Sequence, residues 1–282
     1  MLRSLVGSEM CIRDRDKIVS FCNRHGYTYR FEDNEYYGLP FEVNQSISKE
    51  GVKDYIKSIT KFKPREYQID GVCDCLKHNR RLLVSPTASG KSLMIYSLVR
   101  YYVHKGQKIL LVVPTTSLVE QMYKDFEEYG WDVKNHYHRI YSGREVTNSN
   151  EVTITTWQSV FRMEKSFFKD YDVIIGDEAH LFKSKSLVNI MTKLEHAKYR
   201  FGFTGTLDGT VTHKLVLEGL FGSVNKVTST KELMDKKTLA NLNIKCIVLK
   251  HPQENGKELK GATYAEEIDY LVHNNVRNNF IF

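Results

Sequence analysis

The sequence predicts an α/β fold in which a parallel sheet is covered by helices on both faces, preceded by a small α/β accessory region. From residue 62 onward, short apolar runs alternate with longer segments of helical periodicity, a pattern typical of parallel sheets built from βαβ units. The runs are apolar throughout, as expected of strands buried on both faces. The five predicted strands occupy residues 81–85, 108–113, 152–155, 172–176 and 199–203.

Composition divides the chain into four predicted regions. The segment 4–14 resembles a translated sequencing-adaptor read, so we expect a non-native leader there. The accessory region is expected to hold a helix at 17–25, a strand at 27–31 and a helix at 49–59 that Ser48 caps. The regions are a leader (1–15), the accessory region (16–61), the main domain (62–250) and a C-terminal segment (251–282).

A phosphate-binding loop is predicted after the first strand, where Gly90, Lys91 and Ser92 open a helix over 91–104. Backbone N–H groups at a helix N-terminus bind anions. A lysine at this position reaches the terminal phosphates, and the next hydroxyl holds Mg²⁺. The strict pattern starts with Gly, where this chain has Ser85; a polar turn with a solvated lysine is the alternative. The predicted phosphate-binding residues are Pro86, Thr87, Ala88, Ser89, Gly90, Lys91 and Ser92.

The other half of a nucleotide site is predicted after the run 172–176. Asp177 and Glu178 follow that run, at the carboxyl end of a parallel strand, where open α/β sheets bind ligands. We expect Asp177 to hold Mg²⁺ opposite Ser92 and Glu178 to orient or deprotonate the attacking water. An isolated Asp-Glu pair is commonly part of a solvated turn. Because the predicted phosphate loop with Lys91 lies upstream, we expect a nucleotide site here instead, with ATP and Mg²⁺ as its cofactors. Lys91, Asp177 and Glu178 are the expected catalytic residues.

Several motifs between residues 62 and 227 resemble, in order, the first motor lobe of superfamily 2 helicases in their Asp-Glu-Ala-His form. Arg65 and Gln68 look like the motif that reads adenine. Within the superfamily, the chain is similar to the recombination helicases of tailed phages. This resemblance implies a RecA-like P-loop NTPase lobe that hydrolyses ATP. It also implies that Gln68 and Arg65 belong to the nucleotide site, with Gln68 bonded to the base and an aromatic neighbour stacked on it.

The resemblance further implies a nucleic-acid-binding surface that grips a strand backbone without reading its sequence. For its Thr and Ser side chains, helix capping is the alternative role, and the two roles can coexist. The residues implied to contact nucleic acid are Pro114, Thr115, Thr116, Ser142, Gly143, Thr155, Thr156 and Gln158. The residues implied to couple hydrolysis to movement are His180, Thr204, Gly205 and Thr206.

The composition indicates a soluble globular protein with an anionic partner. The 282 residues are 41% hydrophobic and 27% charged, with a formal net charge of +7, which favours contact with phosphates. The five cysteines are scattered, unlike a secreted disulfide framework. No apolar run reaches the roughly 20 residues that span a membrane. We therefore expect a cytoplasmic protein without a membrane partner, and the phage resemblance suggests an infected bacterium as its setting.

Together these features predict an ATP-dependent DNA helicase or translocase that remodels branched DNA in recombination, repair or replication. The expected partner is branched or duplex DNA. RNA is kept as an alternative partner because both nucleic acids offer a sugar-phosphate backbone. The alternatives are a restriction-enzyme motor subunit, an RNA helicase and a non-catalytic ATP-gated binding module. Such motors need a second lobe in cis, so we expect 251–282 to be a linker and the start of that lobe. Without its arginine finger, we expect ATP hydrolysis barely above background.

Overall fold

The computed structural model describes residues 22–28, 43–140, 150–207, 209–237 and 261–281. The chain divides into two compact units, Met1–Leu239 and Ala240–Phe282. The predicted leader (1–15) lies outside the described residues. None of the described helices combines the length and the apolar character that a bilayer span requires.

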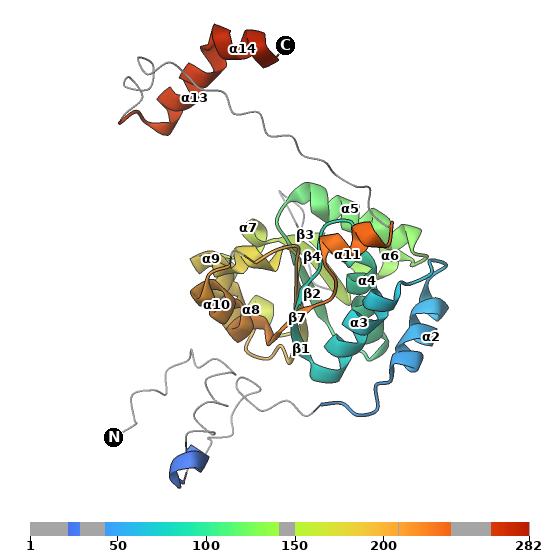
Figure 1. Cartoon of the computed structure of the whole chain (residues 1–282). Helices are drawn as coiled ribbons and strands as arrows, with labels where there is room; N and C mark the ends of the chain where they lie inside the picture. The colour runs from blue at the N-terminus through green and yellow to red at the C-terminus, as the bar shows by residue number, and fades with distance from the viewer. Residues whose placement is uncertain (1–21, 29–42, 141–149, 208, 238–260, 282) are drawn as a thin grey trace. The chain divides into compact units, whose positions relative to one another are not determined.

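A seven-stranded sheet forms the centre of the first unit (Figure 1). Its strands pair in the order β3-β4-β2-β5-β6-β1-β7, and each of the six pairings is parallel. The strands are β1 (Arg80–Val84), β2 (Ile109–Val113), β3 (Tyr137–Ile140), β4 (Val152–Thr156), β5 (Val173–Gly176), β6 (Tyr199–Thr204) and β7 (Val224–Lys226). The predicted α/β fold with a parallel sheet is confirmed.

The two strands that the sequence analysis missed, β3 and β7, are the edges of this sheet. Within the part of the chain that the structure describes, each pairs with one neighbour, and each is short and partly exposed. Edge strands need no continuous apolar run because they are not covered on all sides. Their sequences therefore lack the signal by which the five central strands were predicted.

Helices cover both faces of the sheet, as Figure 1 shows. One layer consists of α2 (Lys49–Ile59), α3 (Glu66–His78), α4 (Lys91–His104), α5 (Thr116–Glu128) and α6 (Val133–His136). The other consists of α7 (Trp157–Val160), α8 (Lys165–Phe168), α9 (Lys185–Lys193), α10 (Val211–Phe221) and the 3₁₀ turn η1 (Ala179–Lys183). The short α11 (Thr230–Asp235) follows β7.

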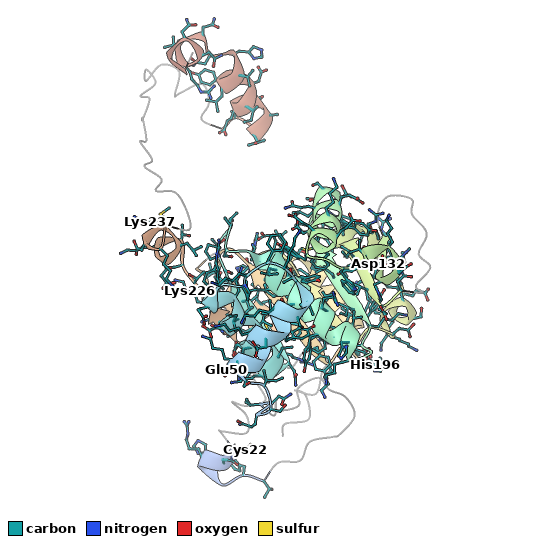
Figure 2. The ribbon with its side chains drawn as sticks, turned by 90° about the vertical axis from the view of Figure 1, so that its right-hand side faces the viewer. Cys22, Glu50, Asp132, His196, Lys226 and Lys237 are labelled. Carbon is teal, nitrogen blue, oxygen red and sulfur yellow. The ribbon has the colours of Figure 1, made fainter. Side chains whose placement is uncertain are left out.

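Successive strand residues point into two separate cores, one under each helix layer. Leu83, Ile109 and Leu111 pack with α2–α5, whereas Leu82 and Leu110 pack with α7–α10. This alternation follows from the pleat, since neighbouring side chains on a strand leave opposite faces. Burial on both faces explains the continuous apolar runs and holds the strand ends rigidly. Exposed side chains mark the outer surface of the unit (Figure 2), including those of Glu50, Asp132, His196 and Lys226.

The accessory region is described only in part. Helix α2 spans Lys49–Ile59 as predicted, and Ser48 Oγ accepts a hydrogen bond from the Gly51 amide at 3.1 Å. Residues 22–25 are helical and lie within the predicted helix 17–25, whose other residues lie outside the described ones. Residues 27–28 are not in a strand, and the rest of the predicted strand 27–31 lies outside the described residues. In the second unit, α13 (Tyr264–His273) begins at a capping box formed by Thr263 and Glu266. Helix α14 (Asn275–Ile281) comes after it in the chain.

Candidate nucleotide site and nucleic-acid interface

The strand order brings three distant loops to one rim of the sheet. Strand β6 lies between β1 and β5, so the loops that follow these strands are neighbours. The Ser85 amide donates to the Thr204 carbonyl at 2.8 Å. A Cβ on Gly205 would lie 3.9 Å from both Lys91 Nζ and the Thr87 amide nitrogen. The predicted phosphate loop therefore touches the predicted coupling residues directly.

Lys91 and Glu178 meet at this rim although 87 residues separate them in the sequence. The Lys91 ammonium donates to Glu178 Oε1 at 2.9 Å, and both side chains are largely shielded from solvent. Glu178 has φ 49° and ψ 50°, in the left-handed region, a conformation that costs a non-glycine residue free energy. This strained turn directs the carboxylate back toward the phosphate loop.

Asp177 supplies a second carboxylate and is nearly buried, with 8% of its surface exposed. Its Oδ1 atom is buried without a hydrogen-bond partner, which is costly for a polar atom. Burial raises the pKa of the Asp177 carboxyl, and the charge of Lys91 opposes this rise. A buried carboxylate oxygen with a free coordination position is suited to a hard cation such as Mg²⁺. Asp177 therefore fits the metal-binding role expected of it.

The phosphate loop is held in shape from inside. Ser85 Oγ donates to Ser89 Oγ at 2.7 Å, and Ser89 Oγ donates to the Pro86 carbonyl at 2.6 Å. Serine in place of the usual first glycine thus contributes a hydrogen bond that braces the loop. Ala88 and Gly90 have φ values of 64° and 78°, which turn the backbone into the helix α4.

Gln68 joins the helix α3 to this loop. Its Nε2 donates to the carbonyls of Ser89 and Gly90 at 2.9 and 3.3 Å, and its Oε1 accepts from the Arg65 amide at 2.8 Å. Tyr67, which stands beside Gln68 in the segment that resembles the adenine-reading motif, also donates to the Ser89 carbonyl, at 2.8 Å. Gln68 is 4% exposed, so here its amide braces the loop. Contact of Gln68 with the adenine remains a prediction.

Arg65 and Ser92, the other two predicted members of the site, bond to tyrosines. Arg65 Nη1 donates to the Tyr67 hydroxyl at 2.9 Å. Ser92 Oγ lies 2.8 Å from the hydroxyl of Tyr129, the residue that ends α5. Tyr129 carries no sequence signal for this contact, because it lies 37 residues away and outside every recognised motif.

A separate cavity of about 570 Å³ gathers most of the predicted nucleic-acid residues. It opens after β2 and β4, which are adjacent in the sheet. Its lining consists of Pro114, Thr115, Thr116, Thr156, Gln158 and Ser159. Thr115 also caps α5 by accepting from the Leu118 amide. Thr115 therefore has the helix-capping role that was the alternative to nucleic-acid contact for these side chains.

Among the described residues predicted to contact nucleic acid, Thr155 does not line this cavity. Thr155 is fully buried, and its Oγ1 donates to the Ile140 carbonyl at 2.9 Å and lies 3.1 Å from the Thr156 carbonyl. Its side chain belongs to the strand interior, because successive strand residues face opposite sides of the sheet. Ser142 and Gly143 lie outside the described residues.

The predicted coupling residues form a hydrogen-bonded chain that starts at Glu178. His180 Nδ1 lies 3.3 Å from Glu178 Oε2 and 3.0 Å from Thr204 Oγ1. Thr204 Oγ1 donates its only hydrogen to the Thr206 carbonyl at 2.9 Å, so His180 carries a proton on Nδ1 and donates to Thr204. His213 Nε2 lies 3.0 Å from the His180 carbonyl. These contacts connect Glu178 to the loop after β6.

Sequence comparison identifies the family of this lobe. Residues 61–209 match the family described as "Type III restriction enzyme, res subunit". The chain belongs to this family. It is also 30% identical over 276 residues to the ATP-dependent DNA helicase uvsW of Enterobacteria phage T4, covering 94% of this chain and 54% of that protein. The DNA 3'-5' translocase XPB2 of Sulfurisphaera tokodaii is 27% identical over 82% of this chain and 47% of its own.

A solved structure agrees with these relatives. The crystal structure of the UvsW helicase from bacteriophage T4 superposes with a TM-score of 0.65 at 29% identity, covering 75% of this chain and 77% of that chain. The resemblance to superfamily 2 helicases, including their phage members, is confirmed. The chain spans about half the length of the curated relatives that it matches.

Proposed function

We propose that this chain is the ATP-hydrolysing lobe of a DNA helicase or translocase that remodels branched DNA. The observation that carries the proposal is the convergence of Lys91, Asp177 and Glu178 at one rim of the sheet. A cavity lined by hydroxyl and amide groups opens after the adjoining strands β2 and β4. Nucleotide chemistry and strand binding are thus supported by neighbouring parts of a single rigid edge.

The proposed chemistry assigns a role to each group. Lys91 binds the terminal phosphate as a point charge, and Glu178 orients the attacking water and accepts its proton. Ser92 and Asp177 would hold Mg²⁺, which supplies charge neutralisation at the phosphates when bound. His180 and Thr204 are proposed to carry the loss of the terminal phosphate, sensed at Glu178, to the loop after β6.

DNA is the proposed nucleic acid because the relatives are named a DNA helicase and a DNA translocase. Thr115, Thr116 and Gln158 would donate to phosphates of one strand, which positions the protein without reading sequence. We propose a second lobe in cis as a further partner. The proposed setting is the cytoplasm of a phage-infected bacterium, which the phage relative supports.

The decisive experiment is an ATPase assay with single-stranded, duplex, forked and RNA ligands, on this chain and on a version extended through a second lobe. We expect forked DNA to stimulate the extended protein most, with stimulation falling as salt rises. We expect the 282-residue chain to stay near background. An extended protein that ignores every nucleic acid would overturn the proposal.

A second candidate is the motor subunit of a restriction enzyme, which the description of the family favours. Such a motor translocates along duplex DNA and needs no branch. Equal stimulation by linear duplex and by forked DNA would therefore favour this candidate over a branch-remodelling helicase.

A further inference from the structure

The hydroxyl of Ser92, the proposed Mg²⁺ ligand, is bonded to the residue that follows α5. Tyr129 contributes its hydroxyl at 2.8 Å from Ser92 Oγ. Tyr129 is 37 residues from Ser92 in the sequence and lies outside every motif that the sequence analysis recognised.

The hydrogen-bonding capacity of a serine hydroxyl decides what the contact with Tyr129 leaves available. Such a hydroxyl has one hydrogen and two lone pairs. The bond to Tyr129 engages either the hydrogen of Ser92 or one of its lone pairs. In both arrangements at least one lone pair of Ser92 Oγ is left over.

The ring of Tyr129 is fixed by its aromatic neighbours. Its centroid lies 5.1 Å from that of Tyr96, 5.4 Å from that of Phe62 and 6.4 Å from that of Phe126. The first two contacts are edge-on, an arrangement that aromatic pairs favour. The hydroxyl of Tyr129 is therefore held in place before any nucleotide binds.

We propose that Tyr129 is an outer-shell residue that orients the Ser92 hydroxyl and leaves a lone pair of its oxygen available to Mg²⁺. This inference rests on the proposed nucleotide site. Outer-shell partners fix the orientation of metal ligands, and their loss typically lowers metal affinity about 10–100-fold. Tyr129 is accordingly a positioning residue, which acts on the metal through Ser92.

The test is binding of ADP to the 282-residue chain, measured by calorimetry in EDTA and across a Mg²⁺ titration. Tyr129→Phe keeps every ring contact and removes only the hydroxyl. For this variant we expect the Mg²⁺ concentration that half-maximally strengthens ADP binding to rise about 10-fold or more. ADP affinity in EDTA should change by less than about twofold.

A matched control comes from the same helix. Tyr123→Phe makes the same change on α5 without altering the partner of Ser92, and it should titrate like the unaltered chain. Equal losses in EDTA and in Mg²⁺ would assign Tyr129 a purely structural role and overturn the inference, as would an unaltered titration. If the unaltered chain bound ADP in neither condition, the proposed nucleotide site itself would fail.

Discussion

Lys91 Nζ lies 2.9 Å from Glu178 Oε1, so the cation proposed to bind phosphate pairs with the carboxylate proposed to activate water. A terminal phosphate would compete with Glu178 for the same ammonium. Its arrival would release the carboxylate, which would then have His180 as its remaining partner among the described residues of this cluster. Nucleotide binding would thus exchange one anionic partner of Lys91 for another and free Glu178 from its ion pair.

Glu178→Gln should separate nucleotide binding from turnover. The amide keeps the size of the side chain but cannot accept a proton from water. We expect turnover of the two-lobed, DNA-stimulated protein to fall about 10²–10⁴-fold, with nucleotide affinity retained or raised because Lys91 loses its competing anion. Lys91→Ala, measured alongside, should instead weaken nucleotide binding. Normal turnover by the Gln variant would rule out Glu178 as the base.

Asp177→Ala should stabilise the nucleotide-free protein. Burial raises the pKa of Asp177, so between its ordinary and its raised pKa the folded state binds more protons than the unfolded chain. Stability contributed by this residue therefore falls as pH rises through that window, and the buried charge is unfavourable at neutral pH. Removing the Asp177 carboxylate should raise the Tm by about 2–4 °C for each kcal/mol by which the free energy of unfolding increases.

The gain from Asp177→Ala should shrink as pH falls through the raised pKa, because the native carboxyl then becomes neutral. Thermal unfolding between pH 4 and pH 8, with exposed Asp170→Ala as the control, tests this dependence. The same variant should lose the Mg²⁺-dependent part of its nucleotide affinity. A lower Tm at neutral pH would contradict the prediction.

Gly90→Ala should disrupt the contact between α3 and the phosphate loop. The glycine has φ 78°, and an added Cβ would lie 2.3 Å from Gln68 Nε2. The left-handed backbone costs about 1–2 kcal/mol for alanine, and each lost Gln68 hydrogen bond about 1 kcal/mol more. Gly106→Ala is a matched control, since Gly106 has φ 72° with nothing within 4 Å. Denaturant unfolding should show a larger loss at Gly90; equal losses would refute the bracing role of Gln68.

Two positions near the end of β4 should respond differently to mutation. Gln158 is exposed and lines the cavity, so Gln158→Ala should weaken binding to single-stranded DNA by about 1 kcal/mol, roughly fivefold. Thr155→Val should lower stability by a similar amount, because it removes the hydrogen bond to Ile140. DNA affinity of folded Thr155→Val should stay unchanged. Filter binding measures the DNA affinity of both variants, and thermal unfolding measures their stability. Weakened DNA binding by folded Thr155→Val would contradict the prediction.

Much of the fold could be predicted from the sequence because its signals are local. A continuous apolar run such as that of β2 is needed wherever a strand is buried on both faces. Helix α2 was predicted with its exact bounds because Ser48 supplies a cap and the apolar side chains repeat at helical spacing. Edge strand β7 was missed because a three-residue, partly exposed strand carries neither signal.

For the site, the sequence by itself determined which residues carry the chemistry: Lys91, Ser92, Asp177 and Glu178 are of the right types and follow apolar strands. Only the tertiary structure decided their partners. Strand order set β6 between β1 and β5, the pleat buried Thr155 beside the exposed cavity, and the end of α5 brought Tyr129 to Ser92. Such contacts join residues far apart in the chain, and they depend on how helices pack across the sheet, which no local pattern of residues encodes.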